Sequence, residues 1–282
     1  MVAILGGLGA AAAFGTATLS ASRGTRLVAP QVFLAGVMLV GLIVVLPAVL
    51  VQDLPAIGGT DAGWLTLSGA GNVVGLLCAY AALRIGKVGI VAPIVSTEGA
   101  IAAVIAVAAG EGLSRAAGGT LAVIACGIAL AGATRDADEA AADAGRVRGL
   151  LLAIAAALAF GISLYATARV GASLSIAWAV LPARAIGVAA VTLPLAASRR
   201  LVLPRGALPF VLLSGVCEVA GFGSFAIGSR HGIAVSAVLA SQFAALAAVA
   251  AYFLFGERLA RVQIAGVVAI VAGVGVLSAL QA

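Results

Sequence analysis

Apolar residues run along almost the whole chain in long stretches, separated by short polar or charged segments. A helix needs about 20 apolar residues to cross the hydrocarbon layer of a bilayer. Dividing the chain at charges and turn residues therefore predicts an all-α membrane protein with ten transmembrane helices. Their expected spans are 2–21, 31–51, 62–83, 88–109, 116–133, 149–168, 174–197, 207–228, 233–255 and 262–280.

The composition agrees with an outer surface that faces lipid. Hydrophobic residues make up 63% of the 282 residues, charged residues only 9%, and the mean hydropathy is +1.24. A soluble domain carries roughly a quarter charged residues. The 37 glycines fit helix packing in lipid, where small residues let backbones approach closely. The first span lacks the basic start of a signal peptide, so we expect it to remain as a structural helix.

The distribution of basic residues predicts an orientation. The net charge of +6 is scattered through short loops, which argues against a nucleic-acid surface. By the positive-inside rule, the loops after the first, third, fifth, seventh and ninth spans should face the cytoplasm, so both termini should lie outside the cell membrane. These loops hold Arg23, Arg26, Arg84, Lys87, Arg135, Arg146, Arg148, Arg199, Arg200, Arg205, Arg258 and Arg261, whereas the other loops hold Arg115, Arg169 and Arg230.

A repeat with a fixed offset of 146 residues indicates a gene duplication. Gly110-Glu111-Gly112-Leu113 corresponds to Gly256-Glu257-Arg258-Leu259, and Leu67-Ser68-Gly69 corresponds to Leu213-Ser214-Gly215. The register is expected to hold without a gap, which divides the chain into a repeat over 1–134, a charged linker over 135–148 and a repeat over 149–282. Because each repeat has an odd number of spans, the second should be inverted relative to the first, as in many secondary transporters.

The motif Gly256-Glu257-Arg258-Leu259, followed by Gln263-Ile264-Ala265-Gly266, resembles the EamA type of the drug/metabolite transporter superfamily. The weaker copy at Gly110-Glu111-Gly112-Leu113 and the segment Ala79-Tyr80-Ala81-Ala82-Leu83 are similar to the same family. The resemblance covers essentially the whole chain. It implies two five-helix repeats and transport of amino acids, metabolites or drugs, without indicating the substrate.

Five polar residues near the middle of predicted spans are the candidate site. Ionisable groups at this depth usually face a cavity, pair together or lie on a transport path. We expect these residues to form a central cavity in which Glu98 or Glu218 binds a proton in exchange for solute. The structural alternative is that Arg184 and Glu218 form a buried ion pair that only fixes two helices together. The five candidates for substrate or proton binding are Asn72, Glu98, Arg184, Glu218 and Gln242.

Other polar residues have a weaker case. The hydroxyls of Thr97 and Ser241 are expected to bond their own helix backbone. Tyr80 is expected either to line the cavity or to anchor a span end at the membrane interface. Glu111 and Glu257 are interpreted as helix-turn residues. The three cysteines lack metal-ligand spacing and His231 is the single histidine, so we expect no metal, no cofactor and no enzymatic activity.

The sequence therefore predicts a secondary transporter, with export of small metabolites and proton exchange as the favoured interpretation. An organic-anion permease is the alternative if Arg184 has no acidic partner, and a membrane scaffold or receptor is a further alternative. The expected partners are the lipid bilayer, a small solute and protons, with a homodimer left open and no nucleic acid.

Overall fold

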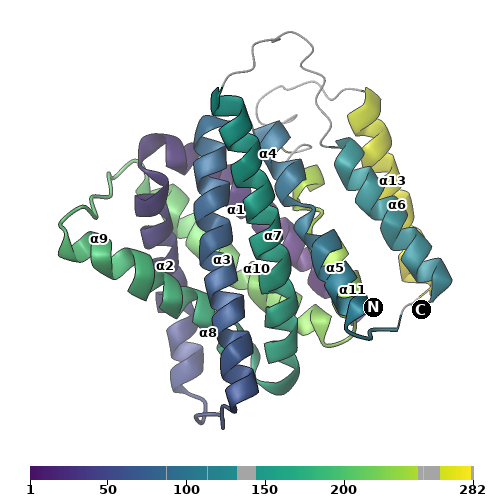
Figure 1. Ribbon diagram of the computed structural model, residues 1–282, viewed down its shortest axis with the longest axis horizontal. Helices are drawn as coiled ribbons and strands as arrows, with labels where there is room; N and C mark the ends of the chain where they lie inside the picture. The colour runs from purple at the N-terminus through teal and green to yellow at the C-terminus, as the bar shows by residue number, and fades with distance from the viewer. Residues whose placement is uncertain (87, 113, 132–143, 247–249, 251–260, 281–282) are drawn as a thin grey trace.

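The computed structural model describes residues 1–86, 88–112, 114–131, 144–246, 250 and 261–280, and every regular element in these ranges is a helix (Figure 1). The first half contains α1 (Val2–Leu27), α2 (Pro30–Leu50), α3 (Gly59–Ile85), α4 (Val88–Val95), α5 (Glu98–Ala108) and α6 (Arg115–Ala131). The second half contains α7 (Ala144–Ser173), α8 (Ile176–Gly187), the π-helix η1 (Val188–Thr192), α9 (Leu193–Ala197), α10 (Leu208–Ser229), α11 (Ile233–Ala240) and α13 (Arg261–Leu280).

The apolar composition of the helices leaves large hydrophobic side chains on the outside of the bundle. Leu5, Ile43 and Leu151 are more than half exposed, which is stable only where the surface meets lipid. Within the described residues, six helices are long and apolar enough to cross a membrane: Val2–Leu27, Pro30–Leu50, Gly59–Ile85, Val147–Ser173, Ile176–Ala197 and Leu208–Ser229. The shorter apolar helices are Glu98–Ala108, Arg115–Gly127 and Ile233–Leu246, so a count of ten spans stays a prediction.

Two of the predicted spans are interrupted by a turn near their middle. The span 88–109 is divided into α4 and α5 by a turn at Ser96 and Thr97. The span 233–255 is interrupted by a turn at Ser241 and Gln242, after α11. At both turns a backbone N–H bonds the carbonyl three residues earlier, from Thr97 to Ile94 and from Gln242 to Leu239, both at 3.2 Å.

Several other helix boundaries support the 146-residue repeat. α1 and α7 end at equivalent positions, and so do the starts of α2 and α8 and the starts of α6 and α13. α7 begins at Ala144, inside the segment 135–148 expected to be a linker; residues 132–143 and the motif around Glu257 lie outside the described residues.

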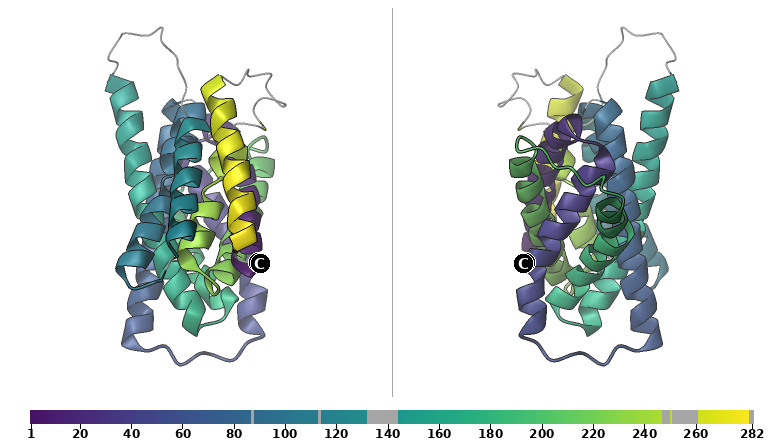
Figure 2. Two further views of the ribbon diagram at one scale, coloured as in Figure 1. Left: turned by 90° about the vertical axis from the view of Figure 1, so that its right-hand side faces the viewer. Right: turned by 90° about the vertical axis from the view of Figure 1, so that its left-hand side faces the viewer.

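The halves pack against each other reciprocally. α1 lies along α10 while α3 lies along α7, α2 packs on α8, and α6 packs on α13; Figures 1 and 2 show this last pair side by side. The start of α1 and the end of α13 lie at one end of the bundle, which we call the terminal end (Figure 1). α1, α3 and α6 finish and α7 begins at the opposite end (Figure 1), called the arginine end because Arg23 and Arg84 lie near the last residues of α1 and α3 and Arg148 lies near the first of α7.

Individual contacts between the two halves show the same reciprocal packing. A Cβ on Gly75 would touch the ring of Phe160, and a Cβ on its equivalent Gly221 would touch the ring of Phe14, the equivalent of Phe160. Exchange of partners between equivalent positions is the mark of a two-fold relationship. Close approach of the helices at these two glycines therefore sets how the halves fit together.

The prediction that the register holds without a gap was wrong in the interrupted helices. The backbone bonds of Ser96, Thr97 and Ile101 correspond to those of Ser241, Gln242 and Leu246, an offset of 145. α4 and α11 also begin 145 residues apart. The structural equivalent of Glu98 is therefore Phe243, and one position is missing from the start of the second interrupted helix.

Candidate functional site

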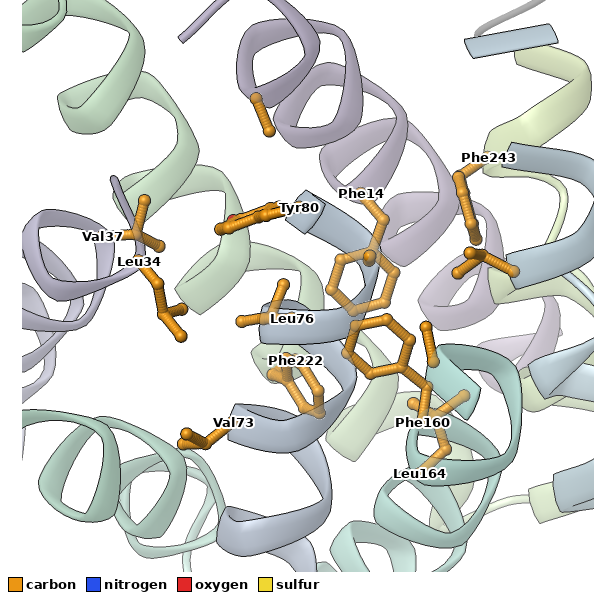
Figure 3. Close-up of a cluster of buried hydrophobic side chains, with 14 of the residues drawn as sticks. Phe14, Leu34, Val37, Val73, Leu76, Tyr80, Phe160, Leu164, Phe222 and Phe243 are labelled. Carbon is orange, nitrogen blue, oxygen red and sulfur yellow. The ribbon is translucent and has the colours of Figure 1, made fainter. Parts of the chain in front are cut away.

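A cavity of about 50 Å³ lies between the two halves. It includes equivalent pairs from both halves, such as Phe14 with Phe160 and Leu76 with Phe222. Figure 3 shows these aromatic and aliphatic side chains converging from several helices. The lining residues are Phe14, Ala17, Thr18, Leu76, Ala79, Tyr80, Leu83, Val91, Ala92, Val95, Glu98, Phe160, Leu164, Glu218, Phe222 and Phe243.

The cavity extends from mid-bundle toward the arginine end. Its wall includes Ala79, Tyr80 and Leu83 near the end of α3, together with Val91, Ala92 and Val95 of α4. The equivalents of Ala79 and Ala92 in the second half are Phe225 of α10 and Ala237 of α11. Both are buried at 0% exposure and neither lines the cavity.

The terminal end is closed by direct helix contact. A Cβ on Gly6 would lie 2.6 Å from Cα of Gly228, and one on Gly7 would lie 2.9 Å from the carbonyl oxygen of Ser236. The hydroxyl of Ser236 donates to the carbonyl of Ala3 at 2.9 Å. Small residues thus allow α1, α10 and α11 to meet backbone to backbone at this end.

Two of the five predicted site residues line the cavity. Glu98 is the first residue of α5, directly after the turn that interrupts the helix, and is 5% exposed. Glu218 lies near the middle of α10 and is 6% exposed. The two carboxyl groups are close enough to interact electrostatically. No hydrogen bond or ion pair to the Glu98 carboxyl occurs within the described part of the chain.

Arg184 lies behind the cavity wall. It is fully buried, and its Nη2 lies 3.5 Å from Oε2 of Glu218. Its guanidinium carbon lies 5.7 Å from the centre of the Phe222 ring, and Nη1 lies 3.7 Å from Sδ of Met38. The ion pair that the sequence offered as a structural alternative therefore exists. Because Glu218 lines the cavity, its pairing with Arg184 also affects the charge of the cavity.

Asn72 and Gln242 are buried without lining the cavity. Asn72, the repeat equivalent of Glu218, is 0% exposed, and neither polar atom of its side chain has a partner in the described ranges. Gln242 lies in the turn after α11, and its side-chain Nε2 likewise has no partner there. Its neighbour Phe243 contributes to the wall instead.

The structure also decides between the roles considered for Thr97, Ser241 and Tyr80. Thr97 and Ser241 donate to the carbonyls of Ile94 and Val238, as expected for hydroxyls in apolar helices. Tyr80 is 3% exposed in the cavity wall, edge-on to Phe33, and its charge environment includes Glu218 and Arg184. It is therefore a lining residue and not an interfacial anchor.

The five predicted site residues do not include the phenylalanines of the cavity. Phe14, Phe160, Phe222 and Phe243 line the cavity, and Phe14 contacts Phe222 edge to face with ring centres 5.3 Å apart. The repeat could have indicated Phe14 and Phe160, because they are equivalent positions in the first helix of each half. Glu111, interpreted from the sequence as a helix-turn residue, makes a contact that the sequence did not indicate: its carboxylate accepts the Ala234 N–H at 3.2 and 3.3 Å and so caps α11.

Comparisons with known proteins agree with this architecture. The family model described as the EamA-like transporter family matches residues 1–133 and again 147–279. A solved structure, titled only "Crystal structure of protein", aligns with a TM-score of 0.74 and 19% identity, covering 99% of this chain and 96% of the other. No curated protein matches the chain. With two family matches spanning the two structural repeats, the chain belongs to the EamA-like transporter family and is a multi-pass membrane transporter of the drug/metabolite transporter superfamily.

Proposed function

We propose that this protein is a ten-span secondary transporter that exports a small solute from the cytoplasm in exchange for protons. The observation that carries the proposal is the cavity between the two repeats, which contains an acid, Glu98, without an ion-pair partner in the described residues. Discontinuous helices beside a central cavity are typical of inverted-repeat transporters. Glu98 follows such an interruption directly.

Glu98 is the proposed proton-binding group. A carboxyl in an apolar cavity is neutral when protonated and requires a compensating charge when ionised. Glu218 has such a compensating charge in Arg184, whereas Glu98 faces only the cavity and the like charge of Glu218. Proton release from Glu98 would therefore be coupled to arrival of another charged or polar ligand.

The expected orientation supports the proposed direction of transport. The cavity reaches toward the arginine end, and the positive-inside rule places arginine-rich loops in the cytoplasm. In this arrangement both termini lie outside and the cavity faces the cytoplasm, where an exporter loads its substrate. Contact of α1 with α10 and α11 closes the opposite side.

The organic-anion alternative needs an unpaired Arg184. Its guanidinium is paired with Glu218, is fully buried and is not a lining residue. A scaffold without transport would leave Glu98 in the cavity without a role.

The test is transport in proteoliposomes with a panel of amino acids, amines and organic acids, with and without an imposed pH gradient. A pH gradient should accelerate transport of at least one solute, and Glu98→Gln should remove that acceleration while the protein still folds. Asp53→Asn, which removes an exposed carboxylate in the loop after α2, is the matched control. Unchanged pH-driven transport by Glu98→Gln would refute proton exchange at this residue.

A further inference from the structure

We infer that an anionic phospholipid binds in a groove on the outside of the bundle, at the arginine end, with its phosphate between Arg84 and Arg148. The groove has a volume of about 390 Å³ and lies between the start of α2, the end of α3 and the start of α7. It shares no lining residue with the central cavity. The inference therefore goes beyond the proposed transport and does not depend on it.

The groove presents two guanidinium groups without a counter-charge. Arg84 lies in the last turn of α3 and Arg148 near the start of α7, and both side chains are exposed. These helices pack along each other (Figure 1), and a Cβ on Gly149 would lie 3.7 Å from Cγ1 of Ile85. Neither arginine has an ion-pair partner within the described residues, and none of the described lining residues is acidic. Because the two positive charges repel each other, a phosphate between them is stabilising.

The start of α2 adds to the positive potential of the groove. Pro30 and Gln31, the first two residues of α2, belong to its wall. The N-terminal end of a helix carries a partial positive charge, which favours phosphate. The exposed side-chain amide of Gln31 provides a further hydrogen-bond donor. The polar part of the groove therefore matches an anionic headgroup.

The remaining part of the groove is apolar and lies deeper in the bundle. Leu77 precedes Arg84 by about two turns of α3. Leu152 follows Arg148 by about one turn of α7. Because α3 ends and α7 begins at the arginine end, both leucines lie farther from the membrane surface than the arginines. Ile85 at this groove is 51% exposed, so the apolar wall is open to lipid. Phosphate contacts above a hydrocarbon wall fit a phospholipid better than a free phosphate ion.

The equivalent groove in the other half lacks free positive charges. It has a volume of about 480 Å³ and lies between α2, α8 and α10, and Arg230 occupies in it the position of Arg84. Arg230 is the single basic residue among its described lining residues, and its Nε and Nη2 already donate to the carbonyls of Gly171 and Leu174. Of the two equivalent grooves, the one at the arginine end is therefore the one that selects an anionic lipid.

Native mass spectrometry of the purified protein, which counts retained lipids, tests the inference. Dioleoyl phosphatidylglycerol and dioleoyl phosphatidylcholine share their acyl chains and are added separately to the protein in detergent. One phosphatidylglycerol should bind about 25-fold more tightly than phosphatidylcholine, since each arginine near a membrane surface contributes about fivefold. Arg84→Gln combined with Arg148→Gln should abolish this preference, and each single substitution should reduce it by about fivefold.

Two controls separate the groove from other sources of binding. Arg200→Gln combined with Arg205→Gln removes two exposed positive charges from the loop between α9 and α10, and this variant should keep the preference of the parent. Glycerol phosphate, which has a headgroup anion without acyl chains, should not displace the bound phosphatidylglycerol when both are present at equal concentration.

Four outcomes overturn the inference. They are equal binding of the two lipids, a preference that survives the substitutions at Arg84 and Arg148, an equal loss in the Arg200 and Arg205 variant, and displacement of the lipid by glycerol phosphate. The third would indicate general attraction to a positive surface, and the fourth a phosphate site that needs no lipid. If the double variant at Arg84 and Arg148 does not fold, the single variants decide, because each has its own expected loss.

Discussion

Arg84 and Arg230 occupy equivalent positions at the ends of α3 and α10, yet only Arg230 ties its helix to a neighbour. Its Nε donates to the carbonyl of Gly171 at 2.6 Å and its Nη2 to that of Leu174 at 2.8 Å, joining the ends of α10 and α7. The equivalent carbonyls for Arg84 belong to Thr25 and Val28 at the end of α1. Arg84 is exposed and makes no such bond in the described part of the chain, and the cavity runs between α1 and α3 on that side.

This asymmetry predicts opposite effects of two equivalent substitutions. Arg230→Ala removes bonds present in the state described here and should shift the protein away from it by about tenfold, since bonds from charged donors contribute about 1.5–3 kcal/mol. Arg84→Ala should instead favour this state, because it removes the bonds that would join α3 to α1 when the cavity closes at the arginine end.

Labelling of a cysteine in the cavity measures the shift. Thr18→Cys in a background without Cys78, Cys126 and Cys217 places the reporter in the cavity wall. Its alkylation by an impermeant maleimide from the arginine end should slow in Arg230→Ala and quicken or stay constant in Arg84→Ala. Arg200→Ala, at an exposed loop position, is the control for loss of a positive charge. Shifts in the same direction would contradict the exchange of bonds.

The pair of Arg184 with Glu218 predicts a specific rescue. Met38 and Asn72 are the equivalents of Arg184 and Glu218 in the first half. Arg184→Met should destabilise the protein by about 3–5 kcal/mol, because it leaves a buried carboxylate without its partner. Arg184→Met combined with Glu218→Asn gives the second half the residues of the first and should recover most of that loss. Thermal unfolding followed by size-exclusion chromatography gives the order of stability, and a double variant less stable than Arg184→Met would contradict the pairing argument.

Two glycines on α10 should respond differently to alanine. A Cβ on Gly221 would collide with the ring of Phe14, whereas a Cβ on Gly223 would make an ordinary contact of 3.8 Å with Ile176. Gly221→Ala should therefore destabilise by about 1–3 kcal/mol through overpacking. Gly223→Ala should be neutral or stabilise by up to about 1 kcal/mol, because alanine restricts the unfolded chain. Denaturation midpoints of the two variants, measured in one detergent, test this predicted difference in stability. Equal midpoints would contradict it.

Glu111 should contribute to stability as a helix cap. Its carboxylate accepts the Ala234 N–H at the start of α11. Glu111→Ala should cost about 0.5–2 kcal/mol, the usual range for a lost cap. Glu111→Gln keeps a carbonyl oxygen as acceptor and should lose less. Equal losses in the two variants, measured by thermal unfolding, would assign the effect to the charge and not to the hydrogen bond.

The apolar pattern was sufficient to predict most helices and the duplication. Expected and observed limits of the last helix differ by one residue at its start, 262 against Arg261, because helix position in a membrane protein is dictated by local hydropathy. Glu98, Arg184 and Glu218 could be selected for the same reason, since an ionisable residue within an apolar run is costly wherever the helix is placed. That cost is a property of the residue and its immediate sequence.

Tertiary packing decided what the pattern leaves open. Hydropathy does not distinguish a continuous helix from one interrupted at Ser96 and Thr97, because both segments are equally apolar. It also does not distinguish Phe243, which lines the cavity, from Leu246 on the outside, because both are hydrophobic. The sequence by itself determined that a duplicated helical bundle buries a few charges in lipid. Only contacts between distant helices decided that Glu218 meets Arg184 while Glu98 faces an aromatic cavity, since such pairings depend on how the two halves fit together.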